Sequence, residues 1–129
     1  MTITPFKRLL LTGAAGGLGQ VLRERLKGYA EVLRLSDIAA MADKAAVHQL
    51  VEGVDAICHF GGVSVERPFE EILGPNICGV FHLYEAARKH GVKRIIFASS
   101  NHVIGFYKQD QQIDARALRR PDGYYGLSK

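Results

Sequence analysis

Apolar residues along this chain fall into short continuous runs separated by stretches of helical spacing. A continuous run is typical of a strand buried on both faces of a parallel sheet, whereas apolar residues three and four positions apart indicate a helix with one buried face. Strands are expected at 7–11, 31–36, 54–60 and 93–98, and helices at 18–26, 43–52 and 68–90. Such alternation calls for right-handed crossovers, so the pattern predicts a Rossmann-like, doubly wound α/β fold with a parallel sheet.

The helical spacing also predicts which helix faces pack in the core. Gly74-Pro75 interrupts the longest helix and should kink or split it, because proline removes a hydrogen-bond donor and clashes with the preceding turn. Asp43 is expected to cap the helix that follows it, and Gly91 to end the longest one. The expected core faces are Leu18, Val21, Leu22 and Leu26 in the first helix, and Phe69, Ile72, Leu73, Ile77, Val80, Phe81 and Tyr84 in the longest.

Glycines follow the first strand at three-residue spacing, at Gly13, Gly16 and Gly19. They let the chain turn sharply and let a pyrophosphate approach the backbone at a helix N-terminus. The spacing departs from the Gly-x-Gly-x-x-Gly fingerprint, so a turn without a ligand is the alternative. Asp37, at the end of the second strand, could accept hydrogen bonds from an adenosine ribose and repel a 2′-phosphate. That placement favours NAD over NADP, although Arg34 weakens the argument and a simple loop or cap role for Asp37 is the other interpretation.

The composition limits the classes of function. With 129 residues, 47% of them hydrophobic, the chain is expected to form one globular domain. No apolar stretch reaches the roughly 18 residues of a membrane span, and residues 1–6 are too short and polar for a signal peptide. The net charge of +4 comes from scattered basic residues without interleaved aromatics, which argues against nucleic-acid binding. Cys58 and Cys78 are interpreted as buried free thiols of a reducing compartment, so the cytoplasm is the default location.

Polar side chains are expected to meet at the carboxyl edge of the sheet, where open α/β sheets bind ligands. Gly61-Gly62 follows the third of the expected strands and residues 99–102 follow the fourth, although ordinary turns would explain each motif alone. Tyr125 and Lys129 are four residues apart and hence neighbours on one helix face. An ammonium group beside a phenol favours the phenolate, which makes tyrosine usable as a base. Together with the glycine turn and Asp37, this pair predicts the site of a nicotinamide-dependent enzyme.

Taken in order, these motifs resemble the extended short-chain dehydrogenases/reductases, and the resemblance covers nearly the whole chain. It rests on Thr12-Gly13-x-x-Gly16-x-x-Gly19, His59-Phe60-Gly61-Gly62, Ser100 and Tyr125-x-x-x-Lys129. The resemblance implies NAD as cofactor. It also implies that the residues contacting NAD are Gly13, Gly16, Gly17, Leu18, Gly19, Asp37, Ile38, Phe60, Gly61, Gly62, Asn76, Tyr125 and Lys129.

Three segments, 61–70, 99–107 and 120–126, are similar to the family members that oxidise hexuronates. Within the second of them, Val103-Ile104-Gly105 stands where the sugar-nucleotide epimerases of the family usually have Val-Tyr-Gly. This difference favours a dehydrogenase, with an epimerase or dehydratase of the same family as the alternative. The resemblance therefore implies oxidation of galacturonate or glucuronate at C1 to an aldarolactone, with hydride passing to NAD.

The resemblance also implies the roles of individual residues. Tyr125, as phenolate, would remove the C1 hydroxyl proton while Ser100 hydrogen-bonds the same oxygen, and Lys129 would support the tyrosine and hold the nicotinamide ribose. For His102 a structural loop role is an equal alternative, and His59 is expected in the core. The residues implied to contact the sugar are Ser64, Ser99, Ser100, Asn101, His102 and Tyr125.

A metal site is not expected. This chemistry needs none, and the available ligands, Cys58, His59, Cys78 and His82, do not have the spacing of a recognised zinc site.

The chain departs from the family pattern in two places. Between Ile38 and Asp43 the family normally carries a third strand, for which this chain has no room. We therefore expect the strand order 2-1-4-5 in family numbering, with the second strand left as an edge. The chain also ends at Lys129, so residues 1–129 are expected to be a partial NAD-binding domain without the family's substrate-binding part.

These departures carry an expectation about activity. A catalytic helix of little more than one turn should fray, so the polypeptide as written is expected to be inactive. Its full-length parent would be an enzyme, and a homo-oligomer of that parent is left open. The competing class is a non-catalytic dinucleotide-binding module that kept the sheet and lost the chemistry.

Overall fold

Four parallel strands form a single sheet in the computed structural model, which describes residues 5–37 and 41–129. The strands are β1 (Phe6–Thr12), β2 (Ala30–Ser36), β3 (Ala56–His59) and β4 (Arg94–Phe97). Their order is β2-β1-β3-β4, and Leu11 lies opposite Leu35 on one side and Cys58 on the other. This order confirms the predicted topology, with β2 at one edge.

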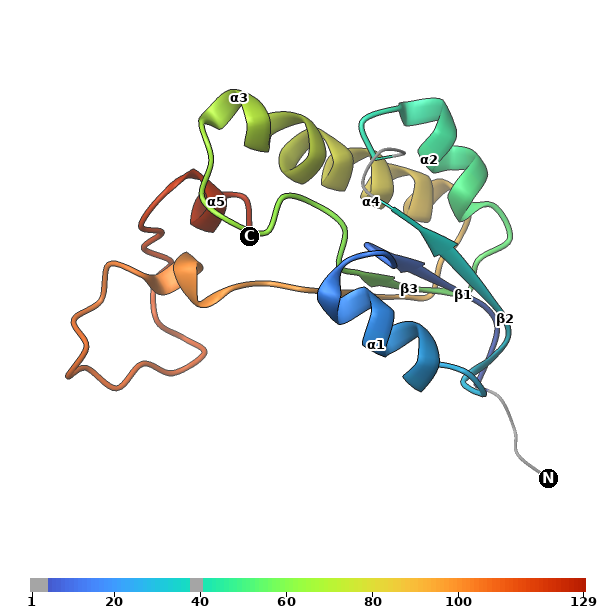
Figure 1. The fold of residues 1–129 in the computed structure, drawn as a ribbon, viewed down its shortest axis with the longest axis horizontal. Coiled ribbons are helices and arrows are strands. Elements are labelled where there is room, and N and C mark those ends of the chain that lie inside the picture. The colour runs from blue at the N-terminus through green and yellow to red at the C-terminus, as the bar shows by residue number, and fades with distance from the viewer. Residues whose placement is uncertain (1–4, 38–40) are drawn as a thin grey trace.

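Helices cover both faces of the sheet, as a doubly wound fold requires (Figure 1). Helix α1 (Gly17–Arg25) lies on one face, and α2 (Lys44–Val51) and α4 (Gly79–Lys89) pack against each other on the opposite face. The side chains of β1 alternate between two apolar clusters, with Leu10 on the α2 and α4 side and Leu9 on the α1 side. The continuous apolar run in β1 therefore supplies both layers of the core.

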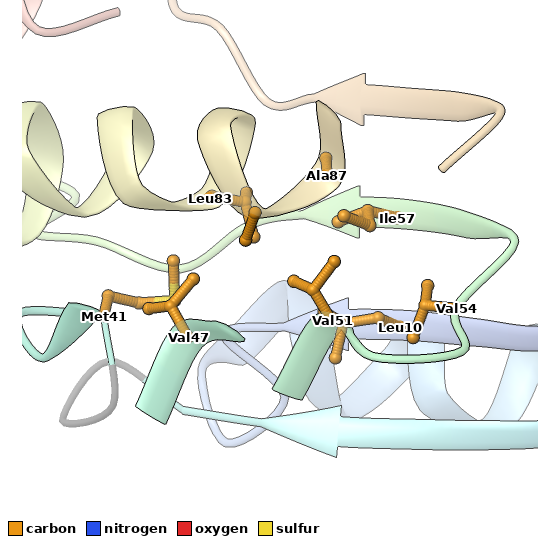
Figure 2. Packing of buried hydrophobic residues seen from close by; sticks show 9 residues of the cluster. Leu10, Met41, Val47, Val51, Val54, Ile57, Leu83 and Ala87 are labelled. Carbon is orange, nitrogen blue, oxygen red and sulfur yellow. The ribbon is translucent and has the colours of Figure 1, made fainter. Parts of the chain in front are cut away.

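The larger apolar cluster fills the space between the sheet and helices α2 and α4 (Figure 2). Leu10 and Ile57 contribute from the strands, and Leu83 from α4 faces them. Most of its side chains are removed completely from water, so each of the leucine, isoleucine, valine and methionine side chains contributes about 1.5–3 kcal/mol of transfer free energy. Its buried members are Leu10, Met41, Val47, Val51, Val54, Ile57, Leu83, Ala86 and Ala87.

Both ends of α2 are held by side chains. At its start the Oδ1 atom of Asp43 accepts hydrogen bonds from the backbone N–H groups of Ala45 (2.8 Å) and Ala46 (3.2 Å), which confirms the predicted cap. At its end Nη1 of Arg34 donates to the carbonyl oxygens of Leu50 (2.6 Å) and Glu52 (2.9 Å). Strand β2 is thereby tied to the helix that follows it.

The predicted long helix is split into three segments, as the Gly-Pro pair indicated. These are α3 (Phe69–Ile72), a π-helical segment η2 (Leu73–Cys78) that contains Pro75, and α4. Gly91, with φ of 68°, follows the end of α4 as expected.

The predicted core face of this helix was wrong in part. Phe81 and Tyr84 are 64% and 44% exposed, and Leu73 is also exposed. The buried face runs through two positions that a hydrophobicity pattern does not count, Asn76 and Gly79. The observed core face therefore includes a polar and a very small residue that the predicted face left out.

The predicted core face of α1 was also wrong at two positions. Leu18 and Val21 are exposed, whereas Leu22 and Leu26 are half-buried against the α1-side cluster. Near the N-terminus of α1 the buried residue is Gly19. Leu18, beside it, lines a pocket and does not pack in the core.

Beyond β4 the chain leaves the sheet and forms a separate lobe of turns (Figure 1). The lobe contains a 3₁₀ turn, η3 (Asn101–Ile104), a long irregular segment and the short helix α5 (Tyr124–Leu127). Between β2 and α2 the described residues contain no strand, and residues 38–40 lie outside them. Within the described part of the chain, no helix is long and apolar enough to span a membrane.

Candidate active site

A pocket of about 300 Å³ lies over the turn that follows β1. Its walls come from the glycine turn, the end of β2 and the loop after β3, all at the carboxyl edge of the sheet. The lining residues are Gly13, Gly16, Gly17, Leu18, Gly19, Asp37, Phe60, Gly62 and Ser64. A larger hollow of about 570 Å³ lies in the loop at 107–117 and contains none of the predicted site residues.

Two of the turn glycines are required by close backbone approach. Gly13 has φ of 71°, and a Cβ there would lie 2.6 Å from the carbonyl carbon of Phe60. A Cβ on Gly19 would overlap the carbonyl oxygen of Gly13. At Gly17, by contrast, a Cβ would meet nothing within 4 Å, so the space above the start of α1 is open. The turn is therefore packed tightly on its inner side and leaves a cradle at the helix N-terminus.

A buried polar cluster joins the glycine turn to β3. The hydroxyl oxygen of Thr12 accepts hydrogen bonds from the N–H groups of Phe60 (3.2 Å) and Gly61 (3.0 Å), and it lies 2.7 Å from Nδ1 of His59. Because the oxygen already accepts twice, its proton points to Nδ1, which leaves the imidazole proton on Nε2. Burial, with a smaller contribution from the charge of Lys129, lowers the pKa of His59 to about 4, so the ring is neutral at pH 7. His59 is only 1% exposed, which confirms its expected place in the core.

Asp37 lines the pocket at the end of β2, as predicted. Arg34, the residue that weakened the argument for NAD, uses its Nη1 on the carbonyl oxygens that end α2. The guanidinium is therefore engaged in the fold. Ile38, another predicted cofactor contact, lies outside the described residues.

Tyr125 and Lys129 are brought together as their spacing predicted. Nζ of Lys129 lies 5.7 Å from the centroid of the Tyr125 ring and 5.3 Å from that of Phe97, whose ring stacks on His59 at 5.6 Å. Burial lowers the pKa of Lys129. The ammonium group of Lys129 therefore lies near both the Tyr125 ring and the Phe97 ring at the end of β4.

The predicted serine and histidine residues surround this pair. Oγ of Ser99 donates to the carbonyl oxygen of Lys129 at 3.3 Å, while Oγ of Ser100 accepts from the N–H of His102 at 3.2 Å. The His102 ring meets the Tyr125 ring edge-on, with centroids 5.6 Å apart. Asn101 is exposed at the start of η3.

Glu66 has a role that the sequence did not predict. Its two carboxylate oxygens accept the backbone N–H groups of Tyr124 and Tyr125, each at 3.0 Å. These N–H groups begin α5 and have no partner within the helix, so a carboxylate from the loop after β3 caps the helix that carries Tyr125. Glu66 is 58 and 59 positions away from them, and no local pattern signals the contact.

Asn76 also acts within the protein rather than at the pocket wall. Its side chain exchanges hydrogen bonds with the backbone of Val63, at 2.7 and 2.9 Å, and donates to Oγ of Ser128 at 2.9 Å. This buried amide therefore links the π-helical segment to the loop after β3 and to the residue that precedes Lys129. Contact between Asn76 and a cofactor stays a prediction.

The described residues contain no group of three or more metal-ligating side chains that could hold an ion. Cys58 and Cys78 are free thiols, and burial raises the pKa of Cys58.

The model of the NAD dependent epimerase/dehydratase family matches residues 9–129. The chain belongs to this family.

Within the family the chain is similar to several uronate dehydrogenases. It is 77% identical to that of Pseudomonas putida over 144 aligned residues, which cover 100% of this chain and 54% of the relative. The corresponding values for the protein of Agrobacterium fabrum are 53% identity, 95% of this chain and 52% of the relative. The crystal structure of uronate dehydrogenase from Agrobacterium tumefaciens superposes with a TM-score of 0.92 at 52% identity, covering 95% of this chain and 52% of that one. A mutant of that enzyme complexed with NAD gives a TM-score of 0.92 at 51% identity, with the same coverage.

Two facts about length follow from these similarities. The chain spans about half the length of the curated relatives it matches. In addition, the alignment with the Pseudomonas putida relative has 144 positions against the 129 residues of this chain, so about 15 positions of that relative have no counterpart here.

Proposed function

We propose that this chain is the cofactor-binding and catalytic half of an NAD-dependent uronate dehydrogenase, which oxidises galacturonate or glucuronate at C1 to an aldarolactone. The observation that carries the proposal has two parts. The glycine turn and Asp37 line one pocket at the carboxyl edge of the sheet, and Lys129, beside Tyr125, lies against Phe97 at the end of β4 on the same edge. The 77% identity to a uronate dehydrogenase over the whole of this chain supports the substrate class.

The pocket fits a dinucleotide. The open space above Gly17 and the N–H groups at the start of α1 suit a pyrophosphate, and Asp37 suits the two hydroxyls of an adenosine ribose. With Arg34 engaged at the end of α2, an unmodified 2′-hydroxyl is the better partner for this edge, which favours NAD over NADP. The residues proposed to contact NAD are Gly13, Gly16, Gly17, Leu18, Gly19, Asp37, Ile38, Phe60, Gly61, Gly62, Asn76, Tyr125 and Lys129.

The chemistry assigned to this chain is proton removal and orientation. Tyr125, as phenolate, removes the proton of the C1 hydroxyl, and Ser100 donates a hydrogen bond to the same oxygen. Bound NAD supplies the acceptor for the hydride that leaves C1. Lys129 places a positive charge beside the phenol, which favours the anionic form. Ser64, Ser99, Asn101 and His102 are proposed to contact the sugar acid.

A chimera tests the proposal directly. This chain replaces the matching N-terminal half of the Pseudomonas putida enzyme, and NADH formation from galacturonate is followed at 340 nm. We expect turnover that falls at least about 100-fold with Tyr125→Phe, because the base is lost, and no comparable turnover with NADP. A chimera that binds NAD but gives no NADH, or that keeps full turnover with Tyr125→Phe, overturns the catalytic assignment.

A second candidate is a dinucleotide-binding module without catalysis. The 15 or so positions missing relative to the Pseudomonas putida protein favour it, because they remove part of the family pattern while the pocket remains. Calorimetric titration of the 129-residue chain with NAD, with NADPH as the control ligand, separates the two: binding by the chain together with an inactive chimera supports the module. An epimerase is less favoured, since the UDP-glucose 4-epimerase of Yersinia pestis is only 30% identical to this chain.

A further inference from the structure

An aspartate outside the predicted site holds the imidazole of His102. Nδ1 of His102 lies 3.0 and 2.9 Å from the two carboxylate oxygens of Asp122. An ionised carboxylate can only accept hydrogen bonds, so Nδ1 carries a proton and Nε2 is the ring nitrogen left for another partner.

The backbone fixes this contact from both sides. The N–H of Asp122 donates to the carbonyl oxygen of His102 at 3.3 Å, and that of Arg120 donates to Val103 at 2.9 Å. A Cβ on Gly105 would overlap the Asp122 carboxylate, so only glycine at this position lets the carboxylate approach so closely. The turn at 101–105 and the turn at 120–123 are therefore one packed unit.

The same unit contains Tyr125. A Cβ on Gly126 would overlap the carbonyl group of His102, so α5 lies directly on the backbone of η3. The His102 and Tyr125 rings meet edge-to-face with centroids 5.6 Å apart and planes at 68°. The His102 side chain is 50% exposed and that of Asp122 33%, which leaves the imidazole accessible beside the phenol.

We propose that Asp122 is a positioning residue that holds His102 in the Nδ1–H form and in one orientation, so that Nε2 is presented to the substrate beside Tyr125. The effect on substrate rests on the proposed function, whereas the orientation of the ring does not. Holding the ring in place before the substrate arrives avoids the entropy cost of ordering it on binding. Loss of Asp122 therefore weakens the binding of the uronate and leaves the binding of NAD unaffected.

Two variants of Asp122 and one control test the orientation. Asparagine can still accept a hydrogen bond from Nδ1–H, whereas alanine cannot. Asp110, an exposed acid of the same lobe, provides Asp110→Asn as the matched control. The ¹⁵N spectrum of the imidazoles at pH 8.5, assigned with His102→Gln, is expected to show His102 protonated at Nδ1 in the unmodified protein, in Asp122→Asn and in Asp110→Asn, and to lose that state in Asp122→Ala.

The kinetic arm uses the chimera described above. We expect Asp122→Ala to raise KM for galacturonate about tenfold, with KM for NAD changed less than about twofold and Asp122→Asn close to the unmodified chimera. The positioning role is overturned if the ¹⁵N spectrum shows the His102 proton on Nε2 in the unmodified protein, or on Nδ1 to the same extent in Asp122→Ala. This readout does not depend on whether the chimera oxidises a uronate. If Asp122→Ala changes both KM values equally, or leaves KM for galacturonate unchanged, then Asp122 does not aid binding of the uronate.

Discussion

At the scale of single residues, His59 shows how burial and a hydrogen-bond partner together set the protonation of a side chain. Nδ1 of His59 accepts a hydrogen bond from the Thr12 hydroxyl group, and burial opposes a charge on the ring. Its pKa of about 4 lies below the ordinary value of 6.5, so the folded protein resists a proton that the unfolded chain accepts. A neutral His59 is therefore linked to folding.

This linkage predicts a loss of stability in mild acid. The contribution of His59 is complete above pH 6.5 and is lost as the pH falls from 6.5 to 4, because only the unfolded chain is protonated in that window. Between pH 7 and 5 the free energy of unfolding should fall by about 2 kcal/mol through this group alone. Urea denaturation at both pH values measures the fall.

Substitutions separate His59 from the other titrating groups. His59→Asn should be less stable at pH 7 but should lose about 2 kcal/mol less than the unmodified protein between pH 7 and 5. His90→Ala, at an exposed position, should leave the fall unchanged. Equal losses in the unmodified protein and in His59→Asn would contradict the assignment.

At the scale of secondary-structure elements, the features that the sequence predicts correctly are those that follow from apolar and capping residues close together in the chain. The strands and the cap at Asp43 follow from residues close in sequence, and the sheet order follows from crossover rules applied to them. The buried face through Asn76 and Gly79 could not be predicted, since neither residue is apolar. Glu66, 58 positions from Tyr124, could not be predicted either, because its role exists only after folding.

The cap that Glu66 places on α5 leads to a prediction for this helix. Glu66→Ala removes two acceptors from N–H groups that have no helical partner, which should cost about 1 kcal/mol and let the first turn open. Hydrogen exchange should show faster exchange of the Tyr124 and Tyr125 amides, and kcat of the chimera should fall about tenfold through misplacement of Tyr125.

A neighbouring acid is the control for Glu66. Glu70→Gln, on the exposed surface of α3, should leave the amide exchange and kcat nearly unchanged. Glu66→Gln keeps one acceptor and should fall between the other two variants. Unaltered exchange of both amides in Glu66→Ala would show that the carboxylate does not hold the helix in solution.

At the scale of the whole molecule, the edge position of β2 shows what a shortened Rossmann-like sheet leaves uncovered. Val32 and Leu35 on this strand are 48% and 44% exposed, and the described residues place no further strand beside it. The relative from Pseudomonas putida has about 15 positions without a counterpart in this chain. We place the missing positions between Ile38 and Asp43, where the family pattern carries a further strand.

Restoring those positions should therefore stabilise the sheet and strengthen cofactor binding together. An added strand pairs the free edge of β2 and shields part of Val32 and of Leu35, which lie on opposite faces of the sheet. Full burial of these side chains would contribute about 1.5–3 kcal/mol each, which is the upper limit of the gain. It would also immobilise the end of β2, where Asp37 faces the pocket, so NAD should bind more tightly. The variant takes the segment from the relative, and urea denaturation and calorimetric titration with NAD measure the two effects. An insert of equal length made of glycine and serine should produce neither effect, whereas a gain in stability without a gain in NAD affinity would show that Asp37 is already held as firmly as binding requires.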